Sequence, residues 1–354
     1  MGVCVPIMPD HLPPLAGLSL HVAPTDMLAP NQGVTKLKPK KRMTLTPQTV
    51  VAQDPERFAQ FQTPIAVLML GHAEGGPPHL ATWYKWATET GRAGTKVYIN
   101  HKATGWAIPA EYAGVIVRLP FPEYELRDTA WGRASLVQAE LNLLAYAFSD
   151  GTPFSHFVLV SEDAVPLRRA DTFSRDIALH PDVSRVVRMG SDQDGIQLEG
   201  MKTARDQWQQ AHQNDPAARN WWVQEYERVA AQLVTHSQWL ALCRRDAALC
   251  VQNLGTLRTM AQDYDRLSGV GPDDPRGGTV CPDEIVIGTF LNMRGIPPST
   301  GVLMAQSQDV TGFHAEAHAT VAALRAAAGQ SSDDAMFGRK LRARLQGNDV
   351  VTWV

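Results

Sequence analysis

The sequence is poor in cysteine, in net charge and in long apolar runs, and each shortage excludes a class of protein. Its four cysteines among 354 residues match no zinc signature and are too few for a disulfide framework. The formal net charge of −3 provides no basic field, so we expect no nucleic-acid partner. The longest apolar runs, such as residues 65–70, fall far short of the roughly 18–20 residues of a membrane helix. A globular chain without a transmembrane segment is predicted.

The amino-terminal segment shows neither a targeting signal nor a regular period. No positively charged stretch leads into an unbroken apolar run, so we expect no signal peptide or membrane anchor. Together with the few cysteines, this favours a cytoplasmic or host-cell soluble protein. Residues 1–60 are rich in proline and are interpreted as an irregular arm. Their basic cluster at 36–42 is interpreted as a solvent-exposed group of charged residues. A nuclear localisation signal and a contact with anionic membranes are the alternatives.

Short apolar runs alternate with amphipathic stretches from Pro64 onward, and residues 61–354 are predicted to form one domain. Strands are predicted at 64–70, 95–100, 114–118 and 157–160, and helices at 79–91, 131–148, 207–234, 237–256 and 315–328. This order predicts an α/β fold with a mostly parallel sheet flanked by helices. Ligands bind such sheets beyond the carboxyl ends of the strands, which here fall at 71–72, 100–102 and 161–163.

Common nucleotide and hydrolase signatures are missing: the sequence has no Gly-X-Gly-X-X-Gly after a strand, no Walker motif and no Gly-X-Ser-X-Gly. Asp192 and Asp194 follow a strand-like segment and form a hypothetical metal-binding pair, although a polar turn is the favoured interpretation. His314 and His318 lie four residues apart on a predicted helix, but no third ligand is evident, which favours surface histidines.

A collinear set of segments between residues 64 and 345, about four fifths of the 354 residues, resembles a known family. The family is that of the core-2/I-branching β-1,6-N-acetylglucosaminyltransferases (glycosyltransferase family 14), and the plant-type branch in particular. WGRASLVQAE, SEDAVPL, SQW and PDE are the strongest motifs in the set. The segments are PIAVLML at 64–70, VYINHKA at 97–103, WGRASLVQAE at 131–140, FVLVSEDAVPL at 157–167, SQWLALCRR at 237–245, CPDEIVIGTFL at 281–291 and FGRKL at 337–341.

The resemblance implies a Rossmann-like, GT-A-type catalytic domain over residues 61–354 and an inverting transfer from a UDP-sugar to a carbohydrate hydroxyl. It implies that no metal ion or other cofactor takes part. The family's catalytic base falls on Glu284, and its diphosphate-binding basic residue falls on Lys340, with Arg339 beside it. A carboxylate to accept the acceptor's proton and fixed cations to stabilise the leaving diphosphate are what this chemistry requires.

The same resemblance places the donor nucleotide at Gly71, His72 and Asn100, just beyond the first two strands. Some family members have aspartate where this chain has Asn100; a loop-capping role is the alternative for this asparagine. Ser237, Gln238 and Trp239 are predicted to frame the acceptor pocket, because aromatic faces stack on sugars, with core packing as the alternative for Trp239. Trp131 is interpreted as a packing residue, with ligand contact as the alternative.

Two other functions are weighed beside this hypothesis. One is a catalytically silent nucleotide- or carbohydrate-binding protein with the same fold. The other is a metal-dependent glycosyltransferase that binds its ion through Asp192 and Asp194 or through Asp163. For Glu284, an acidic residue that only favours the start of a helix is the alternative to a catalytic base. The donor sugar, whether N-acetylglucosamine or another hexose or pentose, lies beyond what the sequence specifies.

Overall fold

A computed structural model describes most of the central part of the chain. The described residues are 64–88, 94–166, 181–189, 194–202 without 196, the single positions 206, 210 and 214, and then 232–267, 280–299, 304–306 and 337–339. The chain divides into two units, Met1–Val50 and Val51–Val354. The predicted irregular arm at 1–60 lies outside the described residues, and every element below belongs to the second unit.

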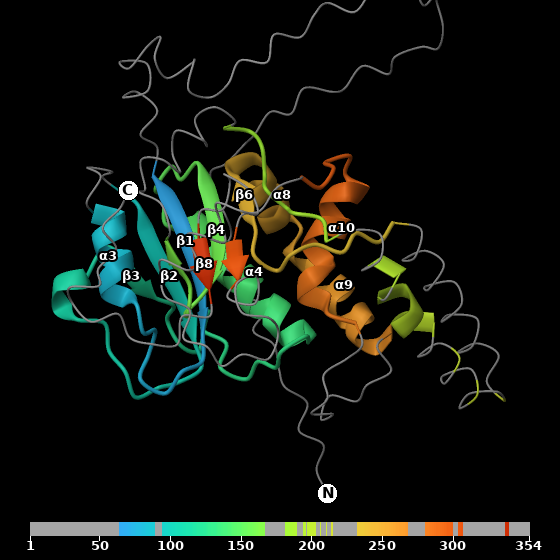
Figure 1. The fold of residues 1–354 in the computed structure, drawn as a ribbon, viewed down its shortest axis with the longest axis horizontal. Coiled ribbons are helices and arrows are strands. Elements are labelled where there is room, and N and C mark those ends of the chain that lie inside the picture. Colours follow the sequence, from blue (N-terminus) through green and yellow to red (C-terminus); the bar gives the residue numbers. More distant parts are fainter. Residues whose placement is uncertain are drawn as a thin grey trace, which may run out of the picture. The chain divides into compact units, whose positions relative to one another are not determined.

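The described elements alternate between strands and helices up to β4, as the apolar runs predict (Figure 1). In chain order they are β1 (Ile65–Gly71), α3 (Leu80–Thr88), β2 (Lys96–His101), η1 (Ala110–Tyr112), β3 (Ile116–Arg118), α4 (Ala134–Ser149), β4 (His156–Ser161), β5 (Val165–Pro166), β6 (Ala241–Cys243), α8 (Arg244–Gln252), α9 (Leu254–Leu267), η2 (Pro282–Glu284), α10 (Val286–Met293), β7 (Met304–Gln306) and β8 (Phe337–Arg339).

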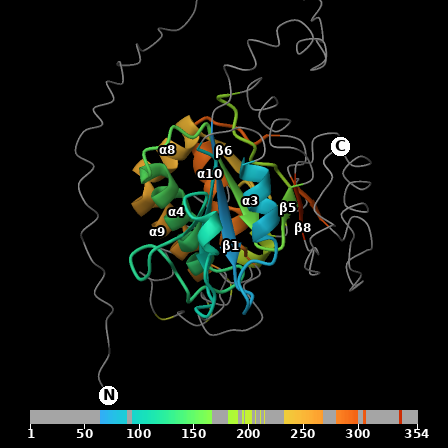
Figure 2. The same cartoon turned by 90° about the vertical axis from the view of Figure 1, so that its left-hand side faces the viewer.

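A five-stranded sheet in the order β3-β2-β1-β4-β6 forms the centre of this unit. β1 pairs in parallel with β2 and β4, β2 pairs in parallel with β3, and β6 alone runs antiparallel, against β4. Figure 2 shows α4, α8 and α9 on one face of the sheet and α3 with β5 on the other. The predicted α/β architecture with a mostly parallel, helix-flanked sheet is confirmed.

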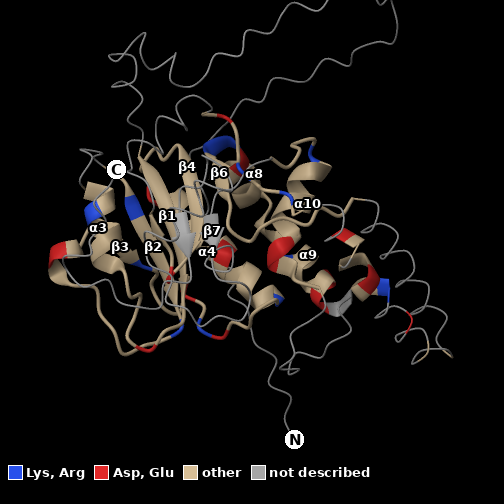
Figure 3. Ribbon diagram, viewed as in Figure 1, with Lys and Arg blue, Asp and Glu red and all other residues tan. Residues whose placement is uncertain are grey.

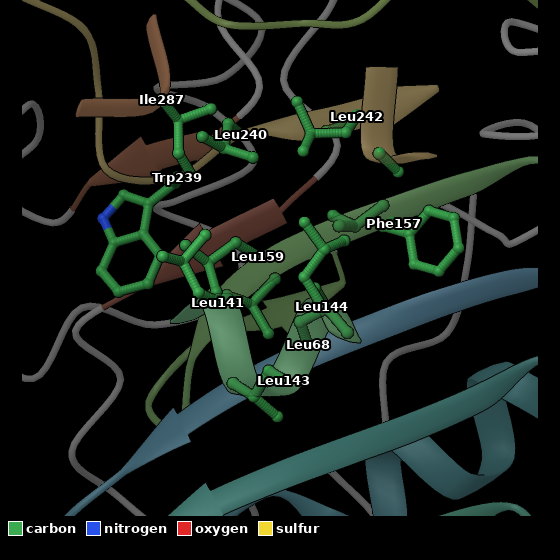
Figure 4. Packing of buried hydrophobic residues seen from close by; sticks show 14 of the residues in the cluster. Leu68, Leu141, Leu143, Leu144, Phe157, Leu159, Trp239, Leu240, Leu242 and Ile287 are labelled. Atoms are coloured by element: carbon green, nitrogen blue, oxygen red, sulfur yellow. The ribbon is translucent and has the colours of Figure 1, made fainter. Parts of the chain in front are cut away.

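The core is continuous across the sheet because the strands are apolar on both faces, which is typical of parallel sheets covered by helices. β1 buries all but one of its seven residues, and α4 buries Val137, Leu141 and Leu144 against the strands. In Figure 4 the leucines of α4 lie beside residues of β1, β4 and β6, with Trp239 at one end of the cluster. On the opposite face the buried Trp83 donates its indole N–H to the carbonyl of Ala164 at 3.0 Å.

One predicted helix is wrong. The segment 237–256 was expected to be a single helix, but residues 241–243 form β6 and the helix α8 begins only at Arg244. The apolar residues of β6 pair with β4 through Ala241↔Val158 and Cys243↔His156, so sheet pairing overrides the helical pattern. Consequently Ser237, Gln238 and Trp239 lie in the irregular connection that leads into β6.

Among the described helices, none combines the length and the apolar character needed to cross a bilayer. The predicted helix at 315–328, with His318 and the neighbouring His314, lies outside the described residues, as does nearly all of the predicted helix at 207–234.

Candidate functional site

The carboxyl ends of β1, β2 and β4 meet at one edge of the sheet, because these strands are parallel neighbours. The register pairs Gly71 with His101 and Leu70 with Ser161, so the residues that follow the three strands lie together. Charged residues are few along these strands (Figure 3), which leaves the polar side chains concentrated at the strand ends. This edge holds three of the predicted donor-binding residues, Gly71, His72 and Asn100.

Glu162, directly after β4, is the centre of the hydrogen bonds at this edge. Its Oε1 accepts the backbone N–H groups of His72 and Ala73, both at 2.9 Å, and its Oε2 lies 2.9 Å from Nε2 of His101. Burial alone would raise the pKa of Glu162, but the hydrogen bonds from His101 and from the two N–H groups outweigh it and hold that pKa below its ordinary value. A buried, ionised carboxylate therefore joins three strand ends.

Gly71 is required at this edge for space. A Cβ atom at this position would overlap Cδ2 of His101 and lie 2.8 Å from Oε2 of Glu162. The observed role of Gly71 is thus to let the His101–Glu162 pair approach the end of β1.

His72 is the most open of the predicted donor-binding residues, with a side chain that is 81% exposed. Its Nδ1 lies 2.9 Å from Oε1 of Glu162, an atom of an ionised carboxylate that only accepts hydrogen bonds. The Nδ1 atom therefore carries a proton, and Nε2 is the ring atom left to meet a ligand.

Asn100 has a structural role in this edge. Its Nδ2 donates to the carbonyl of Leu126 at 2.9 Å, its Oδ1 accepts the N–H of the same residue at 2.7 Å, and the residue is 2% exposed. The side chain thus caps the loop that leads from β3 to α4. This geometry favours the loop-capping alternative for Asn100, because its amide is buried and both ends are engaged with Leu126, while contact with the nucleotide stays a prediction.

Glu284 ends the short turn η2, one residue before α10 begins at Val286, and its side chain is partly exposed. The neighbouring Asp283 is buried, and its Oδ1 has no hydrogen-bond partner among the residues that the structure describes. Burial and the charge of Glu284 raise the pKa of Asp283 to about 7. The turn therefore presents one accessible carboxylate directly next to a buried one.

Glu140 on α4 is the third acid of this cluster. It is buried, and Gln238 donates to its Oε1 at 2.9 Å. Burial and the charges of Asp283 and Glu284 raise the pKa of Glu140, against the opposing hydrogen bond from Gln238. Since α4 also packs against β1 and β2, it connects η2 to the sheet that carries the Glu162 edge.

His236 anchors the backbone of the turn η2 and packs against the helix α10. Its backbone N–H donates to the carbonyl of Glu284 at 2.7 Å, and its ring packs so closely against α10 that a Cβ on Gly288 would overlap it. Burial lowers the pKa of His236 to about 4, so the ring is neutral at neutral pH. The hydrogen bond from His236 thus fixes the backbone of Glu284, and the His236 ring itself adds no positive charge at neutral pH.

The predicted acceptor residues lie in three different environments. Gln238 is buried on Glu140, and the hydroxyl of Ser237 accepts the N–H of Trp239 at 3.3 Å. Trp239 is 6% exposed and belongs to the core cluster, beside leucines of α4 and β4 in Figure 4. This burial favours core packing, the alternative weighed for Trp239, while its contact with the acceptor stays a prediction.

The predicted diphosphate-binding segment pairs with the chain just beyond β4. β8 runs antiparallel to β5, with Val165↔Gly338 and Pro166↔Phe337 as partners. This register leads the backbone of Arg339 toward Ala164, two residues after Glu162. Lys340 lies outside the described residues.

Two of the aspartates considered as metal ligands are engaged within the chain. Asp194 accepts hydrogen bonds from Arg188 and, at 2.7 Å, from the N–H of Thr235, and Asp163 accepts one from the hydroxyl of Ser161. Asp192 lies outside the described residues. Within the part of the chain that the structure describes, no group of three or more histidine, cysteine, aspartate or glutamate residues is arranged to hold a metal ion.

Three residues at the site were not among the predicted site residues: Glu162, Glu140 and Trp131. Glu162 stands at a strand end that the ligand-binding rule for parallel sheets marks, so its position carried a signal. Glu140 is spaced along α4 like a residue of the buried face, and only the packing of η2 against that helix identifies it. Trp131, interpreted from the sequence as a packing residue, is 68% exposed.

Comparison with known proteins adds one match. A family model described as "Branch: Core-2/I-Branching enzyme" matches residues 124–302. The matched region contains α4, β4, β6, η2 and α10, and so includes Glu140, Glu162 and Glu284. A search of the curated proteins found no match.

Proposed function

Because the chain belongs to the core-2/I-branching enzyme family and is therefore a glycosyltransferase that acts on carbohydrate, we propose that it transfers a sugar from a UDP-sugar to an acceptor hydroxyl with inversion. Glu284 is the general base in this proposal. The observation that supports this assignment is the position of the carboxylate. It is partly exposed on a turn fixed by His236 and lies beside two buried acids.

The proposed reaction is a single displacement. The acceptor hydroxyl gives its proton to the Glu284 carboxylate while its oxygen forms a bond to the anomeric carbon of the donor. The bond from that carbon to the diphosphate oxygen breaks on the opposite side, and UDP leaves with the electron pair. Burial and the charge of Glu284 raise the pKa values of both Asp283 and Glu140, so these two acids keep their protons more readily and the partly exposed Glu284 is the carboxylate of the three that is assigned as base.

The donor in this proposal binds at the edge formed by β1, β2 and β4. His72 offers its exposed ring to the nucleotide, and the chain around Arg339 and Lys340 provides cations for the diphosphate. No metal ion is invoked, since fixed cations supply the same electrostatic stabilisation of the leaving group. The pairing of β8 with β5 supports this arrangement, because it leads the backbone of Arg339 toward the residues that follow Glu162.

The test is UDP release from candidate UDP-sugars in the presence of EDTA, with mono- and disaccharide acceptors. We expect turnover in EDTA, and we expect Glu284→Gln to reduce kcat by about 10²–10⁴-fold because the base is lost. Glu111→Gln on the exposed turn η1 is the matched control and retains full activity. Undiminished turnover by Glu284→Gln would contradict the assignment of the base, and activity restored only by manganese would contradict a metal-free mechanism.

A further inference from the structure

Trp131 is the most exposed of the large hydrophobic residues that the structure describes, at 68%. Trp83 and Trp86 are almost fully buried, and Trp239 is 6% exposed. Within the described part of the chain, the Trp131 ring has no stacking, cation–π or hydrogen-bond partner. Exposure of a single indole is common in folded proteins and by itself marks no site, so the case for Trp131 depends on what holds it and what lies next to it.

The backbone on both sides of Trp131 is firmly held. The N–H of Ala130 donates to the hydroxyl of Ser135 at 3.0 Å, and the N–H of Ala134 donates to Oδ2 of Asp265 at 2.9 Å. Arg133 is buried with its guanidinium 3.6 Å from the same aspartate. The exposed ring therefore projects from a fixed segment at the start of α4, which gives it a defined position for a ligand.

The segment that carries Trp131 lies against the segment that carries Glu284. Gly132 is buried with a φ of +64°, and a Cβ at this position would lie 3.5 Å from Sγ of Cys281, the residue before η2. α4 also packs against η2, and the charges of Asp283 and Glu284 contribute to the raised pKa of Glu140 on that helix. The backbone next to the exposed ring thus borders the residue that precedes η2, the turn that carries the proposed base.

We propose that Trp131 is a binding platform for a pyranose ring of the carbohydrate acceptor. One face of a β-linked pyranose presents axial C–H groups and is apolar, and the indole face is the largest apolar surface that a side chain offers. A sugar stacked there would be held beside the Glu284 carboxylate, with its hydroxyl groups still in water. This inference rests on the proposed function, because it identifies the acceptor side of the same site.

The first experiment measures binding without catalysis. Saturation-transfer difference NMR is recorded on the full chain with methyl β-D-galactopyranoside, methyl β-D-glucopyranoside and methyl β-D-xylopyranoside, and with sorbitol as an acyclic control. We expect the strongest transfer to the axial ring protons of at least one pyranoside and no transfer to sorbitol. Trp131→Ala is expected to reduce the transfer at least fivefold, and Trp131→Phe to retain most of it.

Phe121→Ala is the matched control, because Phe121 is also exposed, at 55%, but its ring face is covered by the guanidinium of Arg127 at 3.7 Å. This variant should bind the pyranosides like the unmodified protein. Thermal unfolding confirms that each variant is folded. Equal transfer from the unmodified protein and from the Trp131→Ala variant, or no transfer from the unmodified protein to any pyranoside, would overturn the proposal.

The second experiment separates this inference from the proposed function. In the UDP-release assay at saturating donor, Trp131→Ala should raise the acceptor KM by about tenfold or more and leave the donor KM within twofold. Glu284→Gln should lose turnover yet keep saccharide binding. If Glu284→Gln is inactive while Trp131→Ala leaves the acceptor KM unchanged, the platform is wrong and the base stands. If Glu284→Gln remains active while Trp131→Ala abolishes saccharide binding, the platform stands and the assignment of the base is wrong.

Discussion

The carboxylate of Glu162 and the ring of His101 form a buried pair, 2.9 Å apart, at the carboxyl ends of β4 and β2. The N–H of Ala103 donates to Nδ1 of His101 at 3.1 Å, so Nδ1 is an acceptor and the proton lies on Nε2, facing Glu162. Every partner of Glu162 at this edge is thus a hydrogen-bond donor. An ionised carboxylate, which only accepts, matches this environment.

Replacing Glu162 by glutamine should therefore destabilise the fold. The amide nitrogen of Glu162→Gln would face either the His101 ring N–H or the backbone N–H groups of His72 and Ala73, and one donor would lose its acceptor. We expect a loss of about 2–3 kcal/mol in the free energy of unfolding, measured by urea denaturation. Asp163→Asn, at the next residue, is the control and should change stability by less than about 1 kcal/mol. Equal midpoints for the two variants would contradict this assignment.

Gly71→Ala should disturb the same edge by steric overlap. The new Cβ would meet the ring of His101 and the carboxylate of Glu162, neither of which can move without losing the pair. We expect a destabilisation of about 1–3 kcal/mol and a raised donor KM, because His72 follows directly. Gly105→Ala, where a Cβ would meet nothing within 4 Å, is the matched control. Wild-type stability of Gly71→Ala would show that this close packing is absent.

The buried acids should make stability fall as the pH rises. Asp283 has a pKa of about 7 in the folded chain, above its ordinary value of 3.8, so the folded state binds more protons than the unfolded state between these two values. Its contribution to stability is present below about pH 4 and is lost as the pH rises through 7. Asp283→Asn should therefore raise the melting temperature at pH 8, by about 2–4 °C for each kcal/mol recovered, and have little effect at pH 4.

Glu162 should give the opposite pH dependence of stability and serves as the internal comparison for Asp283. Its pKa is lowered on folding, so its contribution is present at neutral pH and is lost as the pH falls through the folded pKa. Melting temperatures of the protein, Asp283→Asn and Glu162→Gln should therefore be compared from about pH 2 to 8: Glu162→Gln should approach the unmodified protein as the pH falls below 4.5, and Asp283→Asn should gain on it as the pH rises through 7. Parallel curves for the unmodified protein and Asp283→Asn would exclude a raised pKa at Asp283.

Asn100 should respond to substitution as a loop cap. Asn100→Ala leaves the N–H and the carbonyl of Leu126 without partners, which costs about 1–3 kcal/mol for each group that stays buried. Asn100→Asp keeps the acceptor for the N–H but turns a second oxygen toward the carbonyl, so its stability should fall as the pH rises through the aspartate pKa. A donor KM that rises for Asn100→Asp without any loss of stability would instead indicate direct nucleotide contact.

The sequence alone predicts the alternating strands and helices from Pro64 to β4, because buried parallel strands are nearly pure apolar runs and α4 has a clear helical period. It also identifies the family, through motifs that are collinear with it. The helix predicted over 237–256 is wrong in its first third, because the same apolar residues suit a strand, and only the presence of β4 beside them decides between the two structures.

Trp131 and Trp239 show most clearly which property the sequence does not predict, namely the solvent exposure of a side chain. Residue type and helical spacing favour burial for the first and leave sugar contact open for the second, yet the structure exposes Trp131 and buries Trp239 among leucines of the core. Exposure depends on which elements from distant parts of the chain cover a side chain, and neighbouring residues do not encode that. The sequence by itself therefore determined the elements up to β4 and the family, and it singled out Glu284 as the proposed base. The tertiary structure alone decided that Glu162 joins three strand ends, that Asn100 caps a loop and that Trp131 stays open to solvent.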